Sequence, residues 1–165
     1  RHHRRCLVEE LGDGSSELEF TEHILEIDDD SKNYHAWSHR QWALKTYGLW
    51  EKELQFVETK LQEDLRNNSA WNHRFFVVSN TEDLSNAAVR KREIDYALSW
   101  IRRAPNNQSP WNYIYGFANG RISQAEGLQE QCRDCVEKYP TSSHALAMLC
   151  DILDDKGTAE SLAEA

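Results

Sequence analysis

The nine residues Lys32-Asn-Tyr-His-Ala-Trp-Ser-His-Arg40 recur as Arg66-Asn-Asn-Ser-Ala-Trp-Asn-His-Arg74 and, in part, as Asn106-Asn-Gln-Ser-Pro-Trp-Asn-Tyr113. The tryptophans of the three copies are 34 and 40 residues apart. The same phase continues outward, because Arg1 stands 36 residues before the first tryptophan and Leu146 stands 35 residues after the third. Periods of this length are typical of stacked helix pairs, in which each pair buries its apolar face against the next. We therefore predict an all-α fold, an α-α superhelix (solenoid) of stacked antiparallel helix pairs.

Each copy is followed by a second segment in register. Phe20 and Phe56, in Glu17-Leu-Glu-Phe20 and Glu53-Leu-Gln-Phe56, both stand 19 residues after the tryptophan position, whereas Tyr96 of the third copy stands six residues late. The polar stretch 79–86 accounts for this delay if it forms an extended loop between helices. Residues at helical spacing predict an amphipathic second helix in each unit: Leu18, Thr21 and Leu25, then Leu54, Val57 and Leu61. The period predicts a single domain over residues 1–165 with about five units, namely 1–31, 32–65, 66–105, 106–139 and 140–165, the first truncated at its start.

The ends of the predicted helices carry residues with known boundary preferences. An asparagine stands four positions before each tryptophan, at Asn33, Asn67 and Asn107, where its side chain can cap exposed backbone N–H groups. Pro105 and Pro140 cannot continue the preceding helices and fix the turns. A histidine and an arginine also recur after the first two tryptophans, at His39, Arg40, His73 and Arg74. Recurrence is typical of structural residues, so we expect the tryptophans to fill the seams between helices and these polar residues to form hydrogen bonds and ion pairs there.

The composition excludes several functions. The net charge of −9 argues against a general nucleic-acid-binding protein, and the absence of an apolar run of 18 residues predicts no membrane span. The acidic run 17–30 is interpreted either as a solvated helix face or as a surface for a basic partner. Cys132 and Cys135 have CxxC spacing, but no second pair completes the four ligands of a structural zinc site. We expect no metal site in this chain and the reduced thiols of a cytoplasmic protein.

The repeated motif N-x-x-A-W-x-H-R differs from the tetratricopeptide pattern and resembles the repeats of protein prenyltransferase α subunits. The resemblance is close over residues 32–42 and continues over residues 49–56 and 63–80. It is strong from about residue 1 to 115 and weak beyond 120, where only the repeat phase survives. Within the family, the run 66–80 is more similar to the α subunit shared by protein farnesyltransferase and type I geranylgeranyltransferase than to the α subunit of the Rab enzyme.

This resemblance implies one subunit of an αβ heterodimer that joins a farnesyl or geranylgeranyl group, from its diphosphate, to a cysteine of CaaX-terminated proteins. In that family the β subunit holds the catalytic zinc and the lipid pocket, and magnesium is also expected in the complex. The α subunit wraps around the β subunit and supplies polar groups to the diphosphate and peptide site. The chain alone is then expected to hold no cofactor and to be inactive without its β subunit.

Three residues are the candidates for those polar groups. The resemblance places a diphosphate-contacting tyrosine at Tyr34, with His35 beside it near the active-site cleft. Lys32 could add positive charge, because a departing diphosphate needs cations and hydrogen-bond donors placed in advance. The positions equivalent to Tyr34 and His35 in the next repeat are Asn68 and Ser69. Residues that do not recur on a recurring frame are better functional candidates than those that do.

Two questions stay open at this stage. In the family an essential catalytic lysine lies in a Lys-Asn-Tyr block one repeat before Lys32, which would stand just upstream of Arg1, so we expect the chain to be a fragment. A non-catalytic helical-repeat scaffold for protein–protein interaction is the alternative function. The sequence leaves the choice between farnesyl and geranylgeranyl transfer undecided, since that choice is expected in the β subunit.

Overall fold

The computed structural model describes residues 2–27, 30–118 and 120–157. All regular elements in these ranges are helices, which confirms the predicted all-α class. They group into two compact units, residues 1–81 and 82–165. The division of residues 1–165 into a single domain of five units stays a prediction.

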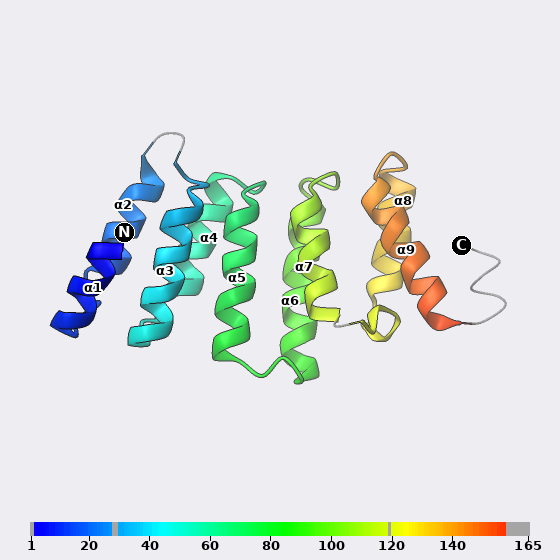
Figure 1. Cartoon of the computed structure of the whole chain (residues 1–165). Coiled ribbons are helices and arrows are strands. Elements are labelled where there is room, and N and C mark those ends of the chain that lie inside the picture. Colours follow the sequence, from blue (N-terminus) through cyan, green and yellow to red (C-terminus); the bar gives the residue numbers. More distant parts are fainter. Residues whose placement is uncertain (1, 28–29, 119, 158–165) are drawn as a thin grey trace. The chain divides into compact units, whose positions relative to one another are not determined.

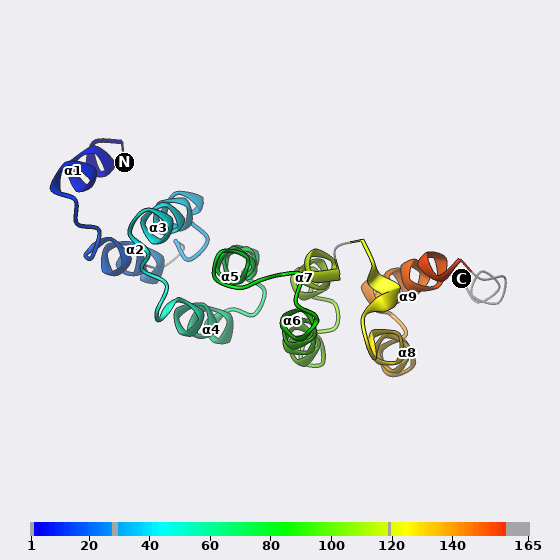
Figure 2. The same ribbon diagram turned by 90° about the horizontal axis from the view of Figure 1, so that it is seen from below.

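The first unit contains α1 (His2–Leu11), α2 (Glu17–Glu26), α3 (Tyr34–Tyr47), α4 (Glu53–Glu63) and α5 (Asn68–Thr81). From α2 onward, consecutive helices of this unit run in opposite directions (Figure 1). Helix α3 packs against α2 and α5 packs against α4, and α3 also contacts α5. Within this unit α3 and α5 therefore form one layer and α2 and α4 the other (Figure 2).

The second unit contains α6 (Ala87–Ile101), α7 (Gln108–Ala118), the short 3-10 helix η1 (Ile122–Gln124), α8 (Leu128–Lys138) and α9 (Ser143–Lys156). It repeats the same arrangement: α7 packs against α6, α9 packs against α8, and α7 contacts α9. None of the described helices in either unit is both long and apolar enough to cross a membrane.

The most extensive packing is offset by one helix from the predicted units. Each predicted unit begins with a tryptophan helix, whereas in the structure each tryptophan helix packs chiefly on the helix that precedes it, giving the pairs α2–α3, α4–α5 and α6–α7. A repeat period gives the length of a unit but leaves its starting point free. The packed pair therefore consists of the second helix of one predicted unit and the first helix of the next.

The predicted helix starts are confirmed. The side-chain oxygen of Asn33 accepts hydrogen bonds from the backbone N–H groups of His35 and Ala36, at 2.9 and 3.2 Å. Asn67 and Asn107 accept the equivalent bonds at the starts of α5 and α7. These bonds satisfy N–H groups that have no partner within the first turn of a helix.

The tryptophans occupy the seams as predicted. Trp37, Trp71 and Trp111 are 4%, 1% and 2% exposed. Each indole Nε1–H donates to the backbone carbonyl six residues earlier, that of Ser31, Leu65 or Pro105, at 3.0, 3.0 and 2.9 Å. The bond satisfies the polar end of a buried ring and ties each tryptophan helix to the loop before it.

One expectation about the repeats is wrong. Residues 79–81 belong to α5, and the connection to α6 spans only residues 82–86, as short as the 48–52 connection between α3 and α4. The six-residue delay of Tyr96 is instead taken up at the start of α6, which begins at Ala87, so that Glu93 lies inside the helix and not at its first position. Leu146 takes the tryptophan position of α9 but is 43% exposed.

Candidate functional site

The three predicted site residues lie together at the N-terminal end of α3. Tyr34 is the first residue of the helix and is 74% exposed, and His35 beside it is also exposed. Their rings meet edge to face, with centroids 5.7 Å apart. Lys32 lies in the preceding turn, where its Nζ is 3.0 Å from Asp64 Oδ2. An aromatic ring this exposed adds little to the folded core.

The charges around this segment are close to balanced. Although burial opposes ionisation, the Lys32 ammonium and the backbone N–H of Arg66 lower the pKa of the Asp64 carboxyl. A second carboxylate, Asp30, accepts a hydrogen bond from Asn33 Nδ2 at 3.1 Å. The positive end of the α3 dipole and the Lys32 ammonium therefore face two carboxylates. The Arg66 charge also acts on Asp64, so an anion bound here would meet charges of both signs.

The backbone that carries the three residues is fixed by the loop of the following repeat. The carbonyl of Ser31 accepts a hydrogen bond from Trp37 Nε1 and another from Asn67 Nδ2, both at 3.0 Å. Asp64, in the same following loop, holds Lys32. The start of α3 is thus restrained both by its own cap and by the loop before α5.

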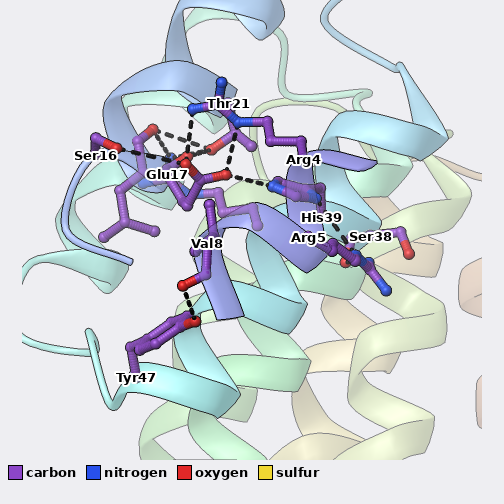
Figure 3. Close-up of polar contacts among 11 residues, drawn as sticks. Arg4, Arg5, Val8, Ser16, Glu17, Thr21, Ser38, His39 and Tyr47 are labelled. Carbon is purple, nitrogen blue, oxygen red and sulfur yellow. Dashed lines mark hydrogen bonds and ion pairs between the residues drawn. The ribbon is translucent and has the colours of Figure 1, made fainter. Parts of the chain in front are cut away.

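A second set of polar residues is buried between the helices, and it includes glutamates for which the sequence predicted no such role. Glu17 begins α2 and is 0% exposed. Its carboxylate accepts hydrogen bonds from Arg4 Nε and Nη2 at 2.8 and 2.7 Å, and His39 Nε2 lies 2.6 Å from its Oε2 (Figure 3). Figure 3 shows α1 and α3 each contributing one of these partners to the carboxylate on α2.

The same arrangement recurs one repeat later. Glu53 begins α4, is 1% exposed, and accepts hydrogen bonds from Arg40 Nε and Nη2 at 2.6 and 2.9 Å. His73 Nε2 lies 2.5 Å from Glu53 Oε1. Arg40 also donates to the carbonyl of Leu18 at 2.7 Å and to Thr21 Oγ1 at 3.1 Å, so it joins α2, α3 and α4. The predicted seam roles of His39, Arg40 and His73 are confirmed.

The hydrogen-bond partners of His39 and His73 indicate the same tautomer for both rings. His73 Nδ1 faces the side-chain amide nitrogen of Gln41 at 3.4 Å, and His39 Nδ1 faces Arg5 Nε at 3.4 Å. Because those partners are donors, each Nδ1 must accept, and each Nε2 carries the hydrogen that is donated to the glutamate. Each ring therefore links a carboxylate to a neighbouring donor.

The ionisation states follow from burial and these contacts. Burial lowers the pKa of His73 below its ordinary value, more strongly than the nearby Glu53 raises it. Burial alone would raise the pKa of Glu53, but hydrogen bonds from His73 and Arg40, together with the Arg40 charge, lower it. Glu17 behaves in the same way: its pKa is lowered by Arg4 and His39 against the effect of burial. The Glu53 cluster is therefore a carboxylate–guanidinium ion pair with a neutral histidine, His73.

The third buried carboxylate, Glu93, has a different set of partners. It is 0% exposed and accepts a hydrogen bond from Tyr113 Oη at 2.5 Å, with tyrosine in the place of the earlier histidines. Arg92, in the additional first part of α6, donates to it at 2.8 Å and also binds Glu82. Arg74 occupies the same position of the repeat as Arg4 and Arg40, and it is 8% exposed. We name Glu17, Glu53 and Glu93 the buried carboxylates.

The signal for the buried carboxylates was present in the sequence. Each precedes by three positions the aromatic residue that marked the second helix: Phe20, Phe56 or Tyr96. In the first two cases the arginine of the cluster stacks on that ring, with Arg4 3.6 Å above Phe20 and Arg40 3.5 Å above Phe56. The expectation that Glu17 belongs to an acidic surface run is wrong, because the residue lies in a seam.

The metal-ligating side chains of the described residues do not cluster. No group of three or more His, Cys, Asp or Glu residues in the described ranges could hold a metal ion. Cys132 is buried in α8, which raises the pKa of its thiol to about 12, whereas Cys135 is half-buried. The described donors of this chain do not fit a zinc ion.

Comparison with known proteins identifies the repeats. The family described as "Protein prenyltransferase alpha subunit repeat" matches residues 15–47, 50–81 and 90–118. The first two matches span α2 with α3 and α4 with α5, and the third spans most of α6 with α7. Each match thus covers one packed pair of helices.

Individual relatives agree with this match. The chain is 43% identical over 121 residues to the protein farnesyltransferase/geranylgeranyltransferase type-1 subunit alpha of Dictyostelium discoideum, covering 72% of this chain and 38% of the relative. It is 36% identical over 94 residues to the geranylgeranyl transferase type-2 subunit alpha of Saccharomyces cerevisiae, covering 54% of this chain and 29% of the relative. The chain thus spans about a third of the length of these relatives.

A solved structure is similar over most of the fold. The Candida albicans protein geranylgeranyltransferase-I complexed with GGPP superposes with a TM-score of 0.76 at 34% sequence identity. The match covers 94% of this chain and 54% of that chain.

Proposed function

Because the chain belongs to the protein prenyltransferase α-subunit repeat family, we propose that it acts in the α subunit of a CaaX protein prenyltransferase of the farnesyltransferase/geranylgeranyltransferase type I class. In this role it wraps a β subunit and places Lys32, Tyr34 and His35 at the site of the isoprenoid diphosphate. The higher identity to a type-1 than to a type-2 subunit favours this class.

The observation that carries the proposal is the contrast between two kinds of polar residue. The recurring ones, such as His39, Arg40 and Asn67, are buried in the seams and occupied by contacts within the chain. Tyr34 and His35 do not recur, are exposed, and lie on a start of a helix that is restrained from two sides. Exposed polar groups on a rigid frame are suited to binding a ligand.

These residues would assist the departure of diphosphate. When the bond between the isoprenoid carbon and the diphosphate oxygen breaks, negative charge grows on the oxygens. The Tyr34 hydroxyl donates a hydrogen bond to one of these oxygens, and the Lys32 ammonium stabilises the charge from the adjacent turn. His35, beside Tyr34, contributes a second donor at the edge of the same site. The solved relative that is complexed with GGPP supports an isoprenoid diphosphate as the ligand of the class.

The remaining components belong to the partner. Zinc, which stabilises the substrate thiolate when it is bound, is assigned to the β subunit because the described donors of this chain do not fit it. The near balance of charge around Lys32 agrees with a shared site, in which the β subunit supplies the other cations for the diphosphate. The peptide substrate is a protein with a CaaX C-terminus, and a cytoplasmic complex agrees with the thiol state of all four cysteines, which lie among the described residues.

Co-expression with a prenyltransferase β subunit tests the proposal. The chain, within its full-length subunit, is expected to form a stable heterodimer that transfers farnesyl or geranylgeranyl to a CaaX peptide. Tyr34→Phe is expected to slow transfer or weaken diphosphate binding about 10- to 100-fold, the value of one hydrogen bond to a charged group. Tyr139→Phe makes the same chemical change on a half-buried tyrosine of unit 2 and should have no effect.

The alternative function predicts a different result. A non-catalytic scaffold would bind a partner protein but would give no transfer with any prenyltransferase β subunit. If the heterodimer forms and transfers, but Tyr34→Phe leaves both the rate and the affinity unchanged, the assignment of Tyr34 to the diphosphate site is wrong.

A further inference from the structure

Asn67 makes two kinds of hydrogen bond at once. Its Oδ1 caps α5, accepting from the backbone N–H groups of Ser69 and Ala70 at 3.1 and 3.3 Å. Its Nδ2 donates to the Ser31 carbonyl at 3.0 Å, across to the loop that precedes α3. The side chain is only 1% exposed, so both bonds are shielded from water.

The second bond does not follow from the capping role. Asn33 holds the equivalent position before α3 and caps that helix, but its Nδ2 turns to Asp30 in its own loop. Ser142, at the equivalent position before α9, makes no side-chain cap, yet its hydroxyl donates to the Pro105 carbonyl at 3.0 Å. The bond to the preceding loop and the cap are therefore separable functions of this position.

The loop that Asn67 holds is the one that carries the candidate site. Ser31 directly precedes Lys32, and the side chain of Lys32 is held by Asp64 in the same following loop as Asn67. Tyr34 is 74% exposed and its ring meets only the exposed ring of His35 among the ring contacts of the described residues, so packing against the core does not fix its direction. The position of its hydroxyl depends on the backbone at the start of α3, and that backbone is restrained by Asn67 through Ser31.

We propose that Asn67 is a positioning residue for the Lys32–His35 site and acts through the Ser31 carbonyl. It touches no substrate, and its effect on diphosphate binding passes through the backbone of the loop before α3. The inference rests on the proposed function for its ligand, an isoprenoid diphosphate, but the restraint itself is a property of this chain alone.

Two variants separate the roles of Asn67. Asn67→Asp keeps a capping oxygen for α5 but replaces the donor that faces the Ser31 carbonyl with a second acceptor. Asn67→Ser provides a shorter cap and a hydroxyl donor of the kind that Ser142 uses in unit 2. The first variant is expected to release the loop before α3, and the second to restore the restraint.

Two control variants account for added charge and for a general loss of stability. Asn68→Asp adds the same negative charge one residue away, on an exposed side chain that, among the described residues, does not hydrogen-bond to Ser31. Ser142→Ala removes the equivalent bond, to Pro105, in unit 2, where no candidate site residue lies. The first variant measures the effect of charge, and the second measures the effect of losing such a bond far along the chain from the site.

Two readouts are measured on these variants in the complex with a β subunit. The first is amide hydrogen exchange over residues 34–37, expected to be about tenfold faster in Asn67→Asp than in the parent, in line with one buried hydrogen bond lost. The second is the affinity for farnesyl diphosphate and for geranylgeranyl diphosphate, titrated separately. For whichever diphosphate the parent binds, Asn67→Asp should weaken binding about tenfold relative to Asn68→Asp, with Asn67→Ser within about twofold of the parent and Ser142→Ala unchanged.

The outcomes distinguish failure of the inference from failure of the proposed function. If Asn67→Asp and Asn68→Asp weaken binding equally, charge explains the effect and the positioning role is refuted. Unchanged exchange over residues 34–37 in Asn67→Asp refutes the restraint itself. If the parent complex binds neither diphosphate, the proposed function is refuted and the positioning role loses its ligand, even where the exchange result confirms the restraint.

Discussion

Replacing Glu53 with glutamine tests whether the buried carboxylates hold the repeats together. The side chain is 1% exposed, and its carboxylate accepts two bonds from Arg40 and lies 2.5 Å from His73 Nε2. Glutamine keeps the volume but removes the charge, and its NH2 group then faces donors. Breaking a buried pair by removing one partner costs about 3–5 kcal/mol. Because Arg40 keeps its bonds to Leu18 and Thr21, we expect a loss of about 3 kcal/mol in the free energy of unfolding.

Urea unfolding at neutral pH, followed by far-UV circular dichroism, measures this loss, and thermal unfolding should show a midpoint lower by about 6–12 °C. Glu126→Gln is the matched control, since that carboxylate is 81% exposed and 4.0 Å from Lys91. The control should change the free energy of unfolding by less than about 0.5 kcal/mol. A loss below about 1 kcal/mol for Glu53→Gln would refute the claim that this cluster stabilises the seam between α3, α4 and α5.

Three further changes test other parts of the frame. Burial lowers the pKa of His73 below 6.5, so as the pH falls the unfolded chain takes up a proton before the folded chain does, and stability decreases below about pH 6.5. In urea titrations between about pH 7 and 5.5, His73→Gln should flatten this decrease in stability. An unchanged slope would assign the decrease to another group. Trp111→Phe removes the bond to the Pro105 carbonyl and part of a 2% exposed ring, and should cost about 2–4 kcal/mol in the same assay. Asn33→Ala should cost about 1 kcal/mol through loss of the α3 cap, and Asn33→Asp, which keeps the capping oxygen, should cost less; equal losses would contradict the capping role.

The sequence predicted those parts of the fold in which residue type and position repeat together. Trp37, Trp71 and Trp111 gave the period, and Asn33 and Asn67 gave the helix starts. These predictions succeed because a cap acts over two or three residues and an indole ring needs a seam of its own size, so that local physics determines both. The starting point of the packed pair was not predictable, because every helix in a stack has two neighbours and the period does not rank them.

The buried carboxylates were missed for a physical reason. A glutamate in the first turn of a helix is expected at the surface, where it favours the positive end of the dipole. Glu17 and Glu53 do begin α2 and α4, but they point between helices because an arginine and a histidine from two other helices reach them. Contacts that join three helices depend on tertiary packing. Only the recurrence of glutamate three positions before each aromatic marker hinted at them.

Tyr34 and His35 were predicted because they differ from the equivalent residues of the next repeat, Asn68 and Ser69, and this contrast explains why they need a rigid frame. Buried ion pairs such as Glu53–Arg40 often add little stability compared with apolar residues of the same volume, but their directional bonds restrict how two helices can slide past each other. A slide between α3 and α5 would move the loop before α5 relative to Ser31 and carry Lys32 with it, since both contacts cross between these loops. The recurring polar residues thus fix the register of the repeats. An exposed side chain such as Tyr34, which has little packing of its own, can be aimed only on a frame whose register is fixed.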